Sequence, residues 1–143
     1  MQYNDDAVLN SIYRNAETAQ TAIFDLIPKV EHAGFLSDIR TQQAEYSAIS
    51  AEAVSQLSAM GKGPEPVNRA KKLGMKMGVE MNTMLQNDVS HLAQLMIKGS
   101  NMGIINMTKV LNDYPNPKPE VKGLADRLIQ AEHQNLERLK VYL

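Results

Sequence analysis

The stretch that decides the fold is residues 119–143, PEVKGLADRLIQAEHQNLERLKVYL. Apolar residues recur in it every three or four positions, which is the period of an α-helix with one buried face. The residues on this face are Val121, Leu124, Ala125, Leu128, Ile129, Leu136, Leu139 and Leu143. Pro119 suits the first turn of a helix, because the backbone N–H that proline lacks would have no partner there. The pattern predicts a long helix over these residues.

Two further helical segments open the chain. The first begins at residue 4 or 5 and extends to Gly34, which would end it in the left-handed conformation. Pro28 lies inside this segment and should kink or loosen its last turn. The second helix is predicted from about Ser37 to Met60, and Gly61 would stop it.

A third helix is predicted over residues 68–98, after a linker rich in glycine and proline at residues 62–66. Gly99 and Ser100 would break it, and a short extra helix would follow at residues 100–113. Long helices joined by short connections favour an antiparallel up-down bundle with crossing angles near ~20°. The sequence therefore predicts an all-α four-helix bundle that forms one domain over residues 1–143, with the short helix between helices 3 and 4.

Composition limits the classes of function. Hydrophobic residues make up 43% of the chain and charged residues 22%, and the formal net charge is −1. So balanced a charge predicts neither nucleic acid nor an anionic membrane surface as a partner. Cysteine is absent, which excludes disulfides and thiolate chemistry. The N-terminal residues lack the pattern of a signal peptide and no apolar run approaches ~18 residues, so we expect a soluble, cytoplasmic protein.

Charged residues on the apolar faces are the candidates for chemistry, since bundles build their sites from inward-pointing side chains. Glu132 lies four residues from both Leu128 and Leu136, at a core position, and Glu80 lies three residues after Met77. The complete set of candidate metal ligands is Glu17, Glu45, Glu80, Asp88, His91, Glu132 and His133.

Carboxylates and histidines spread over four helices suggest a pair of metal ions, which would need about four carboxylates and an imidazole for each ion. Asp88 and His91 have the i, i+3 spacing that places a carboxylate and an imidazole on one helix face. Each residue also has an ordinary interpretation. Glu132 could be a carboxylate at the rim, paired with a lysine or an arginine, and His91 could be a hydrogen-bonded residue at the helix boundary.

Residues 131–139, AEHQNLERL, make the chain resemble the ferritin-like superfamily, and the resemblance extends over most of the length through Glu17, Glu45 and Glu80. It implies a four-helix bundle with an iron or manganese pair, whose ligands include Glu-x-x-His on the second and fourth helices. Here Ala48 stands three residues after Glu45, and Asn135 three residues after Glu132. The metal-binding motif is therefore degenerate.

Methionine is concentrated in the third predicted helix and the segment after it. The residues are Met75, Met77, Met81, Met84, Met96, Met102 and Met107. Methionine fills irregular gaps in a core, which is the first interpretation, and it also serves adaptable interaction surfaces, which is the second. A third interpretation is Cu(I) binding by thioethers together with His91.

From the sequence we expect a non-catalytic protein with a structural or protein-interaction role, a homodimer without a cofactor. The alternative is a di-iron or di-manganese carboxylate oxidoreductase or a metal-storage protein, with an Fe or Mn pair as its cofactor.

Overall fold

The computed structural model describes residues 2–65 and 88–143, and all regular structure within them is helical. The long helices are α1 (Gln2–Leu26), α2 (Ala33–Ala59), α4 (Val89–Asp113) and α5 (Pro119–Leu139). Two short 3₁₀ turns, η1 (Ile27–Lys29) and η2 (Lys140–Tyr142), follow α1 and α5. The prediction of an all-α chain is confirmed for the described residues.

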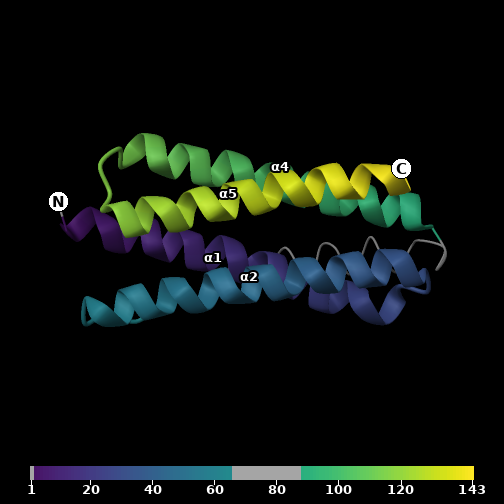
Figure 1. Cartoon of the computed structure of the whole chain (residues 1–143), viewed down its shortest axis with the longest axis horizontal. Helices are drawn as coiled ribbons and strands as arrows, with labels where there is room; N and C mark the ends of the chain where they lie inside the picture. Colours follow the sequence, from purple (N-terminus) through teal and green to yellow (C-terminus); the bar gives the residue numbers. More distant parts are fainter. Residues whose placement is uncertain (1, 66–87) are drawn as a thin grey trace.

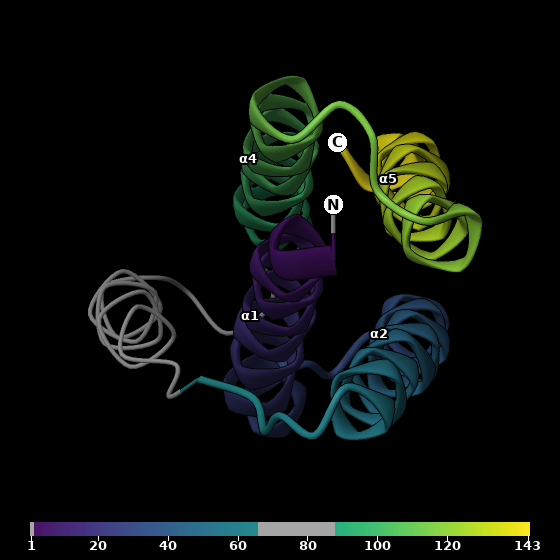
Figure 2. The same ribbon diagram turned by 90° about the vertical axis from the view of Figure 1, so that its left-hand side faces the viewer.

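The four helices lie side by side as two pairs (Figure 1). α1 packs along α2 and α4 packs along α5, and the pairs meet where α1 contacts α4 and α2 contacts α5 (Figure 2). In Figure 1, α1 and α5 run from the end where the N-terminus lies to the other end, and α2 and α4 run in the opposite direction. In the described residues, no helix has the length and apolar character needed to span a membrane.

The core lies between the two pairs and is made from the faces that the apolar spacing predicts. Its buried members include Leu9, Ile12, Ile23, Leu26, Phe35, Ile39, Ile49, Leu57, Leu92, Leu124, Leu128 and Leu139. Burying each such side chain contributes roughly 1.5–3 kcal/mol, so these faces hold the helices together. They also determine which polar residues point inward.

The junction between α1 and α2 differs from the prediction. α1 ends at Leu26, and Pro28 lies in the 3₁₀ turn that follows, because proline cannot donate the backbone hydrogen bond of a continuing helix. α2 begins just after His32, whose Nδ1 accepts the backbone N–H of Phe35 at 3.1 Å. Gly34 therefore lies in the first turn of α2, and the predicted left-handed cap at this position is wrong.

α4 continues without a break through Gly99 and Ser100, so the predicted helix end and the separate short helix at residues 100–113 are wrong. A glycine inside a helix costs only about 1 kcal/mol, which the packing of the buried face of α4 offsets. α4 begins after Asp88, whose Oδ1 accepts the backbone N–H of His91 at 3.0 Å. The helix predicted over residues 68–98 therefore does not continue through residue 88, and its earlier part lies outside the described residues.

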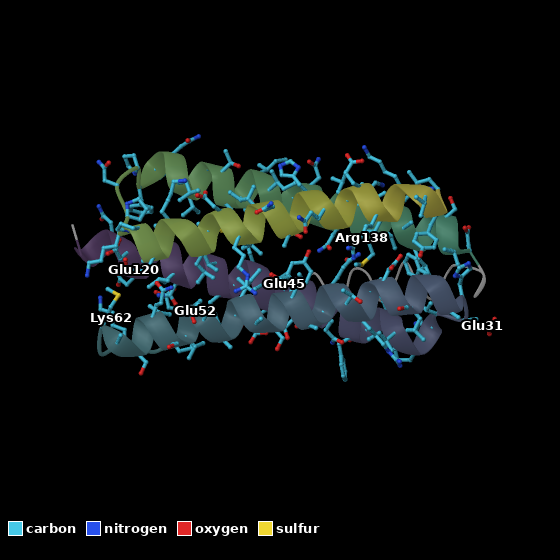
Figure 3. The ribbon with its side chains drawn as sticks, viewed as in Figure 1. Glu31, Glu45, Glu52, Lys62, Glu120 and Arg138 are labelled. Carbon is cyan, nitrogen blue, oxygen red and sulfur yellow. The ribbon has the colours of Figure 1, made fainter. Side chains whose placement is uncertain are left out.

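The chain after α2 is fixed against α1. Gly61 has a φ of 73°, which confirms that glycine ends this helix. Lys62 then forms an ion pair with Asp6 at 2.7 Å, and the backbone N–H of Glu65 donates to Asn10 Oδ1 at 2.9 Å. Figure 3 shows Lys62 at the end of the bundle where α1 begins.

The connection from α4 to α5 is also held by α1. α5 begins at Pro119, as predicted, and its N-cap Lys118 has no capping side chain of its own. The backbone N–H of Lys118 instead donates to Oδ1 of the buried Asp5 at 3.1 Å. The first turns of α1 thus hold both connections at this end of the molecule.

Candidate functional site

Four buried polar side chains meet inside the bundle: Tyr46 on α2, Ser100 on α4, and Glu132 and Asn135 on α5. We call these residues the polar cluster. Glu132 and Asn135 share one face of α5 because they are three residues apart. The Glu132 side chain is only 3% exposed, so its carboxyl group is almost entirely removed from water.

The cluster is connected through the Tyr46 hydroxyl. This hydroxyl donates a hydrogen bond to Glu132 Oε1, and it accepts one from Asn135 Nδ2 at 3.0 Å. Ser100, from the side of α4, acts on Tyr46 and on Glu132 in the direction that lowers the pKa of each. The cluster therefore links three helices through neutral hydrogen-bonding groups around one carboxyl group.

Gly103 on α4 leaves the space that the Glu132 carboxyl group fills. A Cβ atom at this position would lie 3.0 Å from Glu132 Cδ and would overlap Glu132 Oε2. The carboxyl group therefore packs directly against the backbone of α4, one turn after Ser100. Any larger residue at position 103 would displace it.

Burial dominates the electrostatics of the cluster. It raises the pKa of Glu132 from its ordinary 4.5 to about 7, although hydrogen bonds from Tyr46 and Ser100 act in the opposite direction. The pKa of Tyr46 is also raised, first by burial and then by the charge of Glu132. The cluster can thus hold or release one proton near neutral pH while Tyr46 keeps its own.

Gln42 lies one turn before Tyr46 on α2 and is 1% exposed. In the described part of the chain, neither of its side-chain amide atoms has a hydrogen-bond partner. Positions i and i+4 share a helix face, so this amide is on the same side of α2 as the Tyr46 hydroxyl. A buried amide without a partner costs about 1–3 kcal/mol.

Two predicted ligands of the first two helices have other partners. Glu17 on α1 accepts a hydrogen bond from Gln20 Nε2 at 2.9 Å. Glu45 forms an ion pair with Arg127 of α5 at 2.9 Å, and Figure 3 shows it on the edge of α2 that faces α5. Glu132, by contrast, lies in the core, which confirms its predicted core position, and its partner there is Tyr46 rather than a cation at the rim.

The predicted histidine ligands lie apart from the polar cluster. His133 is exposed on α5, and His91 is half-buried in the first turn of α4, where Asp88 caps its backbone. Glu80 lies outside the described residues. Over residues 2–65 and 88–143, no three His, Asp or Glu side chains gather closely enough to hold a metal ion.

The donor set of the polar cluster does not fit an iron or manganese pair. It supplies one carboxylate, Glu132, whereas two metal ions in a bundle need about four carboxylates. The other members are hydroxyl and amide groups, which are weaker ligands for these ions. The seven-residue ligand set stays a prediction, because Glu80 lies outside the described residues.

The described methionines divide between core and surface. Met96 and Met107 are buried, and Met107 Sδ accepts a hydrogen bond from Asn15 Nδ2 at 3.4 Å. Met102 is 57% exposed on the outer side of α4. The copper interpretation depends on Met77, Met81 and Met84, which lie outside the described residues.

Sequence reasoning missed most of the polar cluster. From the sequence, Ser100 is expected only at a helix break and Asn135 only in the place of an absent histidine, and Tyr46 is not among the candidates. A tyrosine at a core position does carry a usable signal, because a buried hydroxyl requires a partner and Glu132 is an acid predicted at a core position.

Comparisons with known protein families, with curated proteins and with solved structures found no match to this chain. The likeness to the ferritin-like superfamily stays a prediction from the residues named above.

Proposed function

We propose that this chain is a cytoplasmic, antiparallel up-down helical bundle of the ferritin-like type that acts without catalysis, by binding a second copy of itself. The observation that carries the proposal is a pair of exposed apolar side chains on α4, Met102 at 57% and Ile105 at 54%. They are three residues apart and therefore share one face of the helix.

This pair lies on the outer side of the segment that carries Ser100 and Gly103 on its inner side. Methionine beside a branched aliphatic residue makes an adaptable apolar contact, of the kind that is enriched in the centres of protein interfaces. A two-fold axis would bring the pair against its own copy, because a two-fold interface uses the same surface on both subunits.

Two of the predicted metal ligands have partners that support a structural role for these carboxylates rather than metal binding. Glu45 is engaged with Arg127, and Glu132 with Tyr46, and both contacts join α2 to α5. These carboxylates thus connect helices within the fold.

The test is the oligomeric state of the purified protein, measured by sedimentation velocity over a range of micromolar concentrations. We expect a dimer that the double variant Met102→Gln, Ile105→Gln converts to a monomer with unchanged helix content. Val141→Gln is the matched control, because Val141 is 78% exposed but lies in η2. A wild-type monomer at every concentration, or a dimer that survives the double substitution, would refute the proposal.

A further inference from the structure

The start of α2 and the turn η2 are joined by a compact set of side chains. Tyr142 donates its hydroxyl hydrogen to Asp38 Oδ2. Its ring packs edge-to-face against Phe35 and against His32, with ring centroids 5.1 and 5.6 Å apart. We call these four residues the C-terminal latch, because Tyr142 holds the turn after α5 to the beginning of α2.

Gly34 lies beside two side chains of the latch, His32 and Tyr142. A Cβ atom there would lie 3.2 Å from His32 Cε1 and 3.7 Å from the Tyr142 hydroxyl oxygen. A side chain at this position would therefore crowd the His32 ring and would reach ordinary contact distance from the Tyr142 hydroxyl. The first turn of α2 therefore lies against both the His32 imidazole and the Tyr142 phenol.

His32 has two tasks in the latch, and both depend on its protonation state. Its Nδ1 accepts the backbone N–H of Phe35 at 3.1 Å, and this bond caps α2. An acceptor nitrogen needs a free lone pair, so this hydrogen bond forms only with an imidazole that has no hydrogen on Nδ1. Protonation would add a hydrogen to Nδ1, so that this atom would point a hydrogen at the Phe35 N–H instead of accepting it.

We propose that His32 is a pH sensor, and that its protonation uncaps α2 and releases the C-terminal latch. The imidazolium cannot accept the Phe35 N–H, and the positive end of the α2 dipole repels it. The ring must therefore leave its position, and with it goes the edge-to-face contact with Tyr142.

The latch contains one carboxylate. Asp38 on α2 accepts the Tyr142 hydroxyl hydrogen, and an imidazolium that turned toward Asp38 would compete with that hydroxyl. The hydrogen bond to Asp38 raises the pKa of Tyr142 to about 12, so this phenol remains a donor throughout the range in which histidine titrates.

Three further charged residues lie at the same end of the molecule. Lys29 in η1 and the exposed Glu31 precede His32 in the connection from α1, and Asp88 caps the beginning of α4 (Figure 1). Asp88 is engaged with the backbone N–H of His91. The acceptor role of His32 Nδ1 decides whether the cap forms.

The experiment is amide hydrogen exchange by NMR on the whole chain, between about pH 5 and pH 7.5, corrected for the intrinsic pH dependence of exchange. We expect the protection of the Phe35 amide and of the amides in η2 to fall roughly five- to tenfold as the pH decreases, which corresponds to the loss of one N-cap. His32→Asn should abolish this dependence, because asparagine caps helices well and does not titrate in this range.

Two further variants make the test specific. His133→Asn removes an exposed histidine from α5 and should keep the wild-type pH dependence. Tyr142→Phe should leave the pH dependence of the Phe35 amide in place but expose η2 at every pH, since it removes only the bond to Asp38. A wild-type protein without pH-dependent protection at Phe35, or a His32→Asn variant that retains it, would overturn the proposal.

Discussion

Replacement of Gly103 with alanine would test the contact that closes the polar cluster. In most helix interiors this substitution stabilises the helix by about 1 kcal/mol, because alanine loses less backbone entropy on folding. At position 103 the added methyl group would overlap the Glu132 carboxyl group. We therefore expect the sign of the effect to be reversed.

The magnitude follows from what Glu132 would lose. Displacement of the carboxyl group would break the hydrogen bond from Tyr46, and hydrogen bonds to charged groups are worth about 1.5–3 kcal/mol. Overpacking of a filled core adds about 1–3 kcal/mol. After the helix propensity gain of about 1 kcal/mol is subtracted, we expect Gly103→Ala to lower the free energy of unfolding by roughly 1.5–5 kcal/mol.

The assay is urea unfolding followed by circular dichroism, fitted for both the free energy and the m-value. Gly99→Ala is the matched control, because Gly99 lies one turn earlier in α4 and a Cβ atom there would meet no neighbour within 4 Å. This control should be stabilised by about 0.5–1 kcal/mol. The two variants should thus differ in sign within one helix.

A double-mutant cycle would attribute the effect to Glu132. In a Glu132→Ala background the obstruction is gone, so Gly103→Ala should become stabilising by about 1 kcal/mol, as at Gly99. If Gly103→Ala stabilises the otherwise wild-type protein as much as Gly99→Ala does, the carboxyl group does not pack against α4, and the geometry of the polar cluster is refuted.

Two further predictions concern buried carboxyl groups. The pKa of Glu132 is about 7 in the folded protein and 4.5 ordinarily. The stability that Glu132 contributes is therefore fully present below about pH 4.5 and is lost as the pH rises to about 7. The loss in the free energy of unfolding is roughly 3 kcal/mol in total. Glu132→Gln should remove this slope in urea unfolding and exceed the wild-type stability at pH 8, while Glu137→Gln, which alters an exposed carboxyl group on the same helix, should retain the slope. Asp5→Ala should lower the free energy of unfolding by about 1–2 kcal/mol, since the backbone N–H of Lys118 loses its acceptor. Asp5→Asn should retain most of the wild-type stability, because the asparagine side chain still offers an oxygen acceptor. Equal losses in the two Asp5 variants would show that this acceptor is unimportant.

The apolar faces of the helices could be predicted because burial follows the helical period so closely. Leu124, Leu128 and Leu139 on α5 are all buried where the spacing placed them. The ends of the helices were less predictable, because a glycine can either end a helix or lie within one. Gly61 ends a helix with a positive φ, whereas Gly34 and Gly99 lie within helices. Only the surroundings distinguish these uses.

The polar cluster could be predicted only in part. The core position of Glu132 followed from its spacing along α5, but its partners come from α2 and α4, at sequence separations that no local pattern encodes. Tyr46 is 86 residues away in the chain. Which residues meet across a bundle depends on the relative rotation and axial shift of the helices, and these are set by the packing of the entire core.

The attachment of α1 to the two connections has a consequence for the order of folding. Asp6 meets a residue 56 positions later, and Asp5 meets one 113 positions later. Contacts at such separations form only after long loops have closed, which slows folding relative to helical proteins dominated by local contacts. During synthesis, α1 could pair with α2 early, but Asp5 would wait until Lys118 had left the ribosome. We therefore expect the beginning of α1 to be the last part of the bundle to gain its native hydrogen bonds.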